Sequence, residues 1–284
     1  MKNSIVKLLI ITVFIFRVTN AFVQNKNVCL LDLQAYFSQD MVVNNSDIQG
    51  DTFVGGDANL NYFEINGRIA VRNYLTANHG TIVGKSYAGS SDFSFVGKRR
   101  HKNVRSNKLN DLNDLFKKQM FDLSAELSTL ETNTQSSYVN GRVEITAREK
   151  VNIVSLSALT LKEAYQLTLR GNEDSLLIIN IDSSNQDKSQ FFRMTLELDT
   201  IRPENIIYNF YNAKNLTLGM VGPLERTYGT GIQGTIIAPY ADINFFMGVI
   251  DGGLYGRSLI HTRPTGQIDP LKVKSNLIRD IICH

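Results

Sequence analysis

The chain has 284 residues, of which 43% are hydrophobic, and its formal net charge is +3. This apolar fraction suffices for a large core in one or two domains, and we expect the chain to fold without a cofactor. Lys2, Lys7 and Arg17 lie in the first 21 residues with no acidic residue to balance them, so residues 22–284 carry about zero net charge (+3 − 3). This balance excludes attraction to a polyanion through the whole molecule's charge, so such binding would need a local patch.

Residues 1–21 are predicted to be a cleaved secretory signal peptide. Two lysines precede and enter an apolar run from Leu8 to Phe16, and Thr19-Asn20-Ala21 offers small residues to a signal peptidase. An uncleaved anchor is the alternative, because Arg17 interrupts the end of the run. No second apolar run of about 20 residues follows, so we expect a secreted protein without a transmembrane span.

A three-residue corner, aliphatic-x-Gly, recurs at fixed intervals. It appears three times at equal spacing early in the chain and twice more, at nearly the same spacing, much later: Ile48-Gln49-Gly50, Ile65-Asn66-Gly67, Ile82-Val83-Gly84, Ile232-Gln233-Gly234 and Ile250-Asp251-Gly252. Short β-branched runs follow most corners. A period of about 20 residues with one turn-forming glycine is typical of stacked β-coils, which predicts a mainly β protein built as a β-solenoid (β-helix).

Between the two groups of corners the pattern becomes helical. Apolar residues at intervals of three and four predict one long α-helix with a buried stripe. The stripe consists of Leu109, Leu112, Leu115, Phe116, Met120, Leu123, Leu127 and Leu130. The helix interrupts the repeats, so we predict a discontinuous solenoid with the helix packed alongside.

Residues 22–284 are expected to form a single domain. In chain order we expect a helix-like cap within 22–45, coils at about 45–97, a basic loop at 98–107, the helix at 108–132, a β insertion at 136–215, further coils at about 216–262 and a tail at 271–284. The cap would cover the open edge of the first coil.

Two cysteines, Cys29 and Cys283, lie near the ends of the mature chain. In an oxidising compartment they can close one disulfide around nearly the whole domain, worth roughly 5 kcal/mol by chain-entropy arguments. They can instead pair with other molecules and cross-link an extracellular coat. The sequence leaves both pairings open, and we favour the internal bond.

Four segments together resemble the choice-of-anchor A family: Asn45 to Asp57, Leu123 to Leu127, Ile206 to Ala213 and Gln233 to Asp242. The resemblance covers most of residues 40–262 in the same order. It implies a secreted or surface-displayed β-solenoid with a lateral helix, and some members of that family are collagen-binding. The architecture is also similar to that of ice-binding solenoids.

The chain departs from the bacterial members of that family. It has no sorting motif, no long C-terminal hydrophobic anchor and no Pro/Thr-rich spacer, which argues against covalent wall anchoring. In composition and layout it resembles the spore wall proteins of microsporidian parasites. That resemblance implies an extracellular coat, a cell surface or a spore wall as the location.

The candidate binding site is a run of cations between the coils and the helix. Six positive charges lie close together in this short segment: Lys98, Arg99, Arg100, Lys102, Arg105 and Lys108. The order x-basic-basic-x-basic-x in Lys98 to Asn103 is associated with heparin-like glycosaminoglycans, and the planar donors of arginine match sulfate. A solvated loop and a proteolytic site are the alternatives. Nucleic-acid binding would use the same charges, but the signal peptide and the lack of clustered aromatic residues argue against it.

Catalytic and metal-binding patterns do not occur in the sequence. The four histidines are scattered, and no H-E-x-x-H, G-x-S-x-G or phosphate-loop pattern appears, so we expect no catalytic residue. Asp47, Asp51 and Asp57 match no calcium motif, and we interpret them as solvated turn carboxylates rather than metal ligands.

Two further expectations concern the surface. Ice binding requires a flat array of small hydroxylated residues, whereas the residue after each corner is uneven and often charged: Asp51, Arg68, Lys85, Thr235 and Gly253. We therefore do not expect ice binding. In a eukaryotic host, Asn44 and Asn215 are glycosylation acceptors of the N-x-Ser/Thr pattern.

The sequence thus predicts a secreted, non-enzymatic protein of an extracellular coat or spore wall. Its solenoid is the scaffold, its basic loop binds host or matrix glycosaminoglycan, and other coat or wall components are its further partners. The alternatives are a purely structural, cross-linked coat protein and a carbohydrate-active solenoid enzyme.

Overall fold

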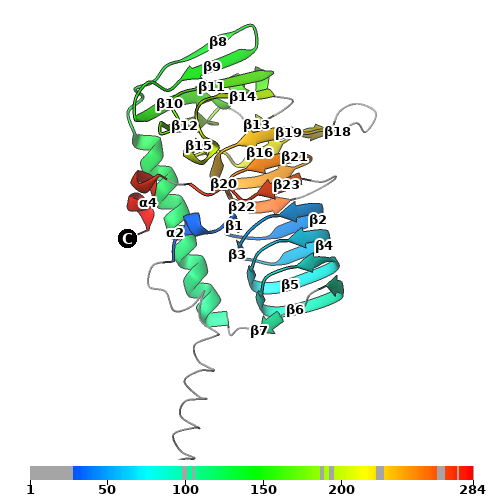
Figure 1. The fold of residues 1–284 in the computed structure, drawn as a ribbon. Helices are drawn as coiled ribbons and strands as arrows, with labels where there is room; N and C mark the ends of the chain where they lie inside the picture. The colour runs from blue at the N-terminus through cyan, green and yellow to red at the C-terminus, as the bar shows by residue number, and fades with distance from the viewer. Residues whose placement is uncertain are drawn as a thin grey trace, which may run out of the picture.

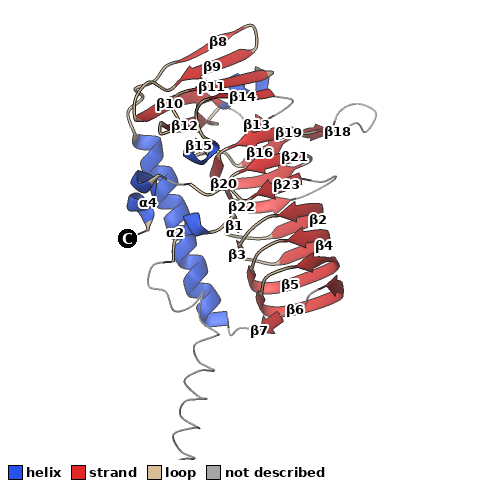
Figure 2. Cartoon of the chain, in the orientation of Figure 1, coloured by secondary structure: helices blue, strands red, loops and turns tan. Residues whose placement is uncertain are grey.

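The computed structural model describes residues 28–97, 101–103, 106–185, 189–191, 195–221, 227–260, 266–273 and 275–283. This part of the chain is mainly β, with a 17-stranded, a 4-stranded and a 2-stranded sheet (Figure 2). Figure 1 shows the strands stacked in one column with the long helix α2 (Ser106–Thr129) beside it. The predicted fold class, a discontinuous β-solenoid with one long helix alongside, is confirmed.

The elements are as follows. Before α2 come η1 (Leu30–Asp32), β1 (Ala35–Phe37), β2 (Met41–Ile48), β3 (Thr52–Val54), β4 (Ala58–Ile65), β5 (Ile69–Ile82), β6 (Ser86–Gly97) and β7 (His101–Asn103). After α2 come β8 (Ser136–Val139), β9 (Arg142–Thr146), β10 (Val151–Ser157), α3 (Ala158–Glu163), β11 (Gln166–Arg170), β12 (Leu176–Asp182), β13 (Ser189–Phe191), β14 (Thr195–Asp199), η2 (Pro203–Asn205), β15 (Ile206–Asn209) and β16 (Asn215–Leu218). The last part holds β17 (Met220–Val221), β18 (Thr227–Tyr228), β19 (Thr230–Gln233), β20 (Thr235–Phe245), β21 (Gly248–Asp251), β22 (Leu254–Ile260), β23 (Gly266–Asp269) and α4 (Asn276–Ile282).

The strands of the large sheet pair in parallel and stack into three ladders. The helix-side ladder runs β10–β12–β15–β20–β22–β1–β3–β5–β6–β7. The middle ladder runs β13–β16–β20–β22–β2–β4–β5–β6. The far ladder runs β19–β21–β23–β2–β4–β5–β6. Long strands such as β5 turn a corner of the column and so belong to more than one ladder.

The strand register explains both the constant spacing of the corner glycines and the separation of the two groups of corners in the sequence. Thr52 stands opposite Ala35 on one side and Ile69 on the other, so successive coils are offset by the same interval that separates the corner glycines. Ala35 pairs on its other side with Leu254. The two groups of corners therefore form one column. Of the helix-like cap expected within 22–45, the structure has only the short helix η1 in the described part. The expected cover over the first coil is wrong, because β1 and β2 follow and the edge of that coil is paired with β22.

Residues 136–215, expected to be an insertion, add strands to this column. Val154 pairs with Ile179, and Ile179 pairs with Tyr208, so these coils are longer than those at the start of the chain. The short helices α3 and η2 lie within them, which is why the regular spacing of the corners did not reveal them. A separate four-stranded sheet contains β9, β11 and β14 in parallel, and β8 joins its edge antiparallel to β9.

The corner glycines are required because successive coils approach closely. A Cβ on Gly67 would overlap the backbone of Gly50, and one on Gly84 would overlap the backbone of Gly67. The aliphatic residue of each corner, such as Ile65, is fully buried. The motif therefore combines an inward anchor with a backbone contact that only glycine permits.

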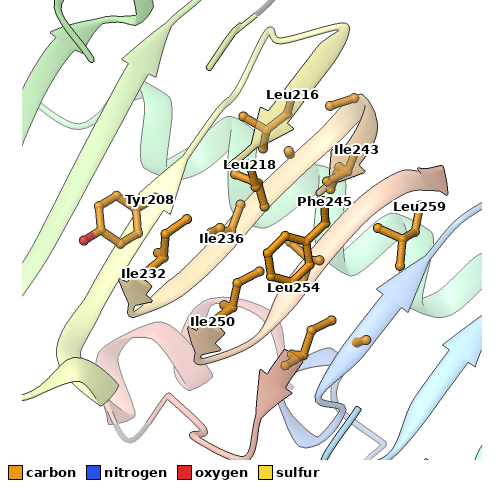
Figure 3. Close-up of a cluster of buried hydrophobic side chains, with 14 of the residues drawn as sticks. Tyr208, Leu216, Leu218, Ile232, Ile236, Ile243, Phe245, Ile250, Leu254 and Leu259 are labelled. Atoms are coloured by element: carbon orange, nitrogen blue, oxygen red, sulfur yellow. The ribbon is translucent and has the colours of Figure 1, made fainter. Parts of the chain in front are cut away.

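Inward side chains from the ladders form the main core. Burial alternates along β2 and β4, as expected for strands with one face inside. Figure 3 shows the C-terminal part of this core, where Ile236, Ile243 and Leu254 meet side chains of neighbouring coils such as Tyr208. Each large apolar side chain buried in this way contributes about 1.5–3 kcal/mol to stability.

A second core lies between α2 and the outward side chains of the helix-side ladder. The ladder supplies Tyr36, Phe53, Ala70, Ile153, Ile178, Ile207, Ile237 and Tyr255. The helix supplies Leu109, Phe116, Met120, Leu123 and Leu127. The predicted stripe is largely confirmed, and Leu115, which is 39% exposed, is its exception.

Buried polar contacts fix the position of α2 on the ladder. Ser124 Oγ donates to Asn209 Oδ1 at 2.6 Å, and Asn209 Nδ2 donates to the carbonyl of Ser124 at 2.9 Å. Asn180 Nδ2 donates to the carbonyl of Leu127 at 2.7 Å. Because an unpaired buried amide is costly, this network favours one position of the helix over any displaced one.

The first and last described segments of the chain meet beside α2. Cys29 and Cys283 form a disulfide, which confirms the internal pairing and leaves no free cysteine for cross-linking. Arg279 of α4 contacts Asp32 of η1 at 2.8 Å. Gln119 Oε1 of α2 accepts a hydrogen bond from the backbone N–H of Leu30 at 2.8 Å.

We expect Gly67→Ala to lower the free energy of unfolding by about 1–3 kcal/mol, because its Cβ displaces the backbone of the neighbouring coil. Gly231→Ala is the matched control: its Cβ meets no atom within 4 Å, and we expect a change within about 0.5 kcal/mol. Urea denaturation measures both. Equal effects of the two substitutions would show that coil contact is not the reason for the corner glycines.

We expect the double substitution Cys29→Ser/Cys283→Ser to destabilise the chain by up to about 5 kcal/mol, because the bond joins cysteines with a sequence separation of 254 and restricts the unfolded state. Urea denaturation of the variant, and of wild type with and without reductant, measures this. A wild-type midpoint that does not change on reduction would contradict the expectation. Mass analysis of non-reduced peptides confirms the pairing independently.

Candidate functional site

The basic segment lies where the first coils end and α2 begins. Lys98, Arg99, Arg100 and Arg105 lie outside the described residues. Lys102 is in β7, which continues the helix-side ladder next to β6. Lys108 is exposed in the first turn of α2. The structure thus places the described part of the segment at the tip of the column, and its proposed ligand stays a prediction.

The two glycosylation candidates lie within strands. Asn44 is half-buried in β2, and Ser46, the third residue of its pattern, donates its hydroxyl to the carbonyl of Gly266. Asn215 is half-buried at the start of β16. Both side chains are therefore part of the ladders, and their modification stays a prediction.

The turn carboxylates have structural partners. Asp51 Oδ2 accepts from Arg68 Nη2 at 2.5 Å, and its Oδ1 accepts from the Arg68 backbone N–H at 2.8 Å. Asp57 Oδ1 accepts from the backbone N–H of Tyr74 at 3.1 Å. Each contact joins one coil to the next, so these side chains brace the column. Among the described residues no group of three or more His, Cys, Asp or Glu side chains is placed to hold a metal ion.

Three half-buried carboxylates lie near one another on the far ladder and are called here the acidic column: Asp251 stands opposite Asp269, and Asp47 stands opposite Gln267, two residues from Asp269. Burial raises the pKa of Asp269, and the charges of Asp251 and Asp47 raise it further. One oxygen of Asp269, Oδ1, is buried without a hydrogen-bond partner. This column is the nearest arrangement, among the residues described, to the grouped carboxylates that a solenoid enzyme requires.

An aromatic column that the sequence interpretation missed stands at another corner. The rings of Tyr62 and His79 stack at 4.9 Å, and those of His79 and Phe95 stack at 4.8 Å. All three residues have left-handed backbone, with φ between 49° and 53°. Stacking of each ring on the next stabilises this strained corner, while the two outer residues, Tyr62 and Phe95, stay 54% and 75% exposed. The nearly constant spacing of these three residues in the sequence, close to the coil period, could have revealed the column.

One groove of the described structure lies between α2 and the corner that joins the helix-side and middle ladders. Its volume is about 740 Å³, within the range of about 300–1,000 Å³ typical of ligand sites. Four consecutive coils and the helix line it: Ser38, Gln39, Lys117, Phe121, Tyr211, Asn212, Lys214, Asn215, Pro239, Tyr240 and Arg257. No sequence motif indicated this site, because its residues meet only after the column has formed.

Cations and aromatic rings share the groove. Lys117 on α2 and Lys214 on the solenoid are both exposed. Tyr240 is 49% exposed, and its ring contacts the edge of Phe121 with centroids 4.9 Å apart. Burial raises the pKa of Tyr211, and the nearby Asp182 carboxylate raises it further, so its hydroxyl keeps its proton. The groove can therefore offer positive charge, a ring face and a hydroxyl.

The comparisons with known proteins give one family and several distant structures. Residues 32–268 match the family described as "Putative Ice-binding-like adhesive domain". Among curated protein sequences there is no significant match. Similar solved structures include the DUF3494 domain of ice-binding protein 1 of Shewanella frigidimarina, with 12% identity, a TM-score of 0.48, and coverage of 86% of this chain and 95% of that one.

Two further structures are similar at the same level. An ice-binding protein from the Antarctic ascomycete Antarctomyces psychrotrophicus has 10% identity and a TM-score of 0.40, covering 86% of this chain and 96% of that one. An ice-binding protein from an Antarctic biological consortium has 14% identity and a TM-score of 0.41, covering 87% and 92%. At these TM-scores we draw no argument from the structures.

The family that matches is not the one that the sequence resembles. The match supports an adhesive domain, and it does not support membership of the choice-of-anchor A family or a relation to spore wall proteins. The matched range takes in most of the chain and all three ladders of the column. The chain therefore belongs to the family of ice-binding-like adhesive domains.

Proposed function

We propose that the chain is a secreted adhesive protein of a cell surface or extracellular coat that binds a heparin-like glycosaminoglycan through its basic segment, Lys98 to Lys108. Membership of an adhesive-domain family fits a surface or extracellular role. Among the described residues, no helix is long and apolar enough to cross a membrane. The placement in a spore wall or other coat is part of this proposal.

The position of the basic segment at the tip of the column carries the proposal. In the described structure β7 is the last strand of the helix-side ladder, and it lies at the opposite end of the column from β8 and β9 (Figure 1). A coil inside the column is flanked by two neighbours that can supply carboxylates. β7 and the start of α2, which are the described parts of the six-cation segment, lie at this tip (Figure 1), and this position supports the proposal. Arginine donors suit the sulfate groups of such a polymer.

Several arginines elsewhere on the column form ion pairs with carboxylates. Arg170 contacts Glu144 at 3.4 Å, and Arg68, Arg202 and Arg257 contact Asp51, Glu173 and Asp242. These cations are at least partly neutralised by carboxylates of neighbouring coils. Residues 22–284 carry a net charge of about zero, so binding of a polyanion depends on a local excess of positive charge.

The alternatives have less support. Cross-linking through cysteines is not available, since Cys29 and Cys283 are bonded to each other. The acidic column is half-buried, and the family's description is adhesive rather than enzymatic. The residues after the corners include the charged pair Asp51 and Arg68, which disrupts the regular hydroxyl array that we expect of an ice-binding face.

We expect the variant Lys98→Ala/Arg99→Ala/Arg100→Ala/Lys102→Ala to lose about tenfold or more in heparin affinity and to elute from a heparin column at lower salt, because four positive charges are removed together. Wild-type retention should itself fall as salt rises.

A second variant controls for net charge. It removes four exposed cations far from the segment: Arg148, Lys150, Lys162 and Lys272. Elution of this control at wild-type salt is the expected result. Equal elution of wild type and the basic-segment variant would end the proposal. Adsorption to ice with thermal hysteresis, without retention on heparin, would favour the family's other described activity.

A further inference from the structure

The groove beside α2 is built from one corner of four consecutive coils. Tyr211 to Asn215 connect β15 to β16, and Pro239 and Tyr240 lie at the bend of β20. Arg257 lies at the equivalent bend of β22, and Ser38 and Gln39 connect β1 to β2. Rungs of a parallel ladder are about 4.8 Å apart, so the four corners span about 14 Å. An elongated, chain-like ligand fits this shape better than a compact one.

The positive charge of the groove comes from the two lysines. Asp242 lies beside both Lys214 and Arg257: its backbone N–H donates to the carbonyl of Lys214 at 2.9 Å, while its Oδ1 accepts from Arg257 Nε at 2.8 Å. Arg257 takes both oxygens of this carboxylate. Lys214 therefore has no ion-pair partner among the described residues, and the same is true of Lys117 on the opposite wall.

The walls that carry these charges are fixed. Lys117 and Phe121 lie one helical turn apart on α2, and the helix is held by the Ser124–Asn209 hydrogen bonds close by. On the other wall, Asn212 Nδ2 donates to Asp182 Oδ1 at 2.7 Å, and Asn212 Oδ1 accepts from the backbone N–H of Ser183 at 2.8 Å. A ligand would meet a preformed site, which lowers the entropic cost of binding.

We propose that this groove binds an acidic saccharide chain, with acidic groups between Lys117 and Lys214 and a sugar ring against the exposed face of Tyr240. Lysine ammonium groups supply the attraction, the aromatic ring packs on the apolar face of a sugar, and the amide and hydroxyl groups of Gln39 and Tyr211 orient it. Carboxylate and sulfate groups share this chemistry. The inference rests on the proposed adhesive function and adds a second contact site to it.

The test separates the groove from the basic segment. It uses the full secreted chain carrying the four basic-segment substitutions described above, so that the segment contributes nothing. Two probes are titrated by calorimetry: a tetrasaccharide of uronic acids and a sulfated heparin tetrasaccharide. We expect this protein to bind at least one of them and to lose about tenfold or more when Lys117→Ala and Lys214→Ala are added. The probe that binds identifies the acidic group.

Two further variants complete the design. Lys162→Ala/Lys272→Ala removes the same charge from exposed sites outside the groove and should leave binding unchanged. Tyr240→Ala should weaken binding without altering its dependence on salt, because it removes ring contact and no charge. Binding of neither probe, or equal binding with and without the two groove lysines, would overturn the inference. Neither result depends on whether the basic segment binds heparin.

Discussion

Parallel pairing between the first and the last coil holds this solenoid together. The short strand β1 lies between β3 and β22, so it joins segments from opposite ends of the chain. Gln34 is fully buried at this junction, and its Nε2 donates to the carbonyl of Gly252 at 2.5 Å. Tyr255 donates its hydroxyl to the carbonyl of Leu33 at 2.9 Å. Without this junction the protein would be two stacks, each with an exposed strand edge.

Helix α2 packs across the same junction and stabilises it. Its buried side chains meet Tyr36 and Phe53 in the first coils, while Ser124 and Leu127 bond to Asn209 and Asn180 on the other side of the junction. A helix that contacts both stacks resists their separation, and the disulfide beside it adds to that effect. The second core therefore fixes α2 as the outer wall of the groove. Phe121 contacts Tyr240 because the helix is held in this position on the ladder.

The sequence predicted those parts of the fold that repeat locally. The spacing from Gly50 to Gly84 is a direct record of coil length, because each glycine contacts the next coil. The coils between Val154 and Tyr208 were not recognised, because α3 and η2 lengthen them and remove the period. The groove was beyond prediction for a different reason. Gln39, Lys117 and Tyr240 belong to three distant segments, and only the junction and the docked helix bring them together.

The pairing of charges between neighbouring coils determines which cations of this fold have no ion-pair partner. Residues one coil apart are neighbours, so a cation is paired wherever the next coil presents a carboxylate, as Arg68 is by Asp51 and Arg257 by Asp242. Within the part of the chain that the structure describes, Lys214 has no ion-pair partner, because Arg257 already occupies both oxygens of Asp242, the carboxylate beside it. The site proposed at the basic segment rests instead on position, since β7 is the last described strand of its ladder. On this reasoning the two places proposed for an acidic polymer on this nearly neutral solenoid are its tip and a corner where the neighbouring carboxylate is already paired with an arginine.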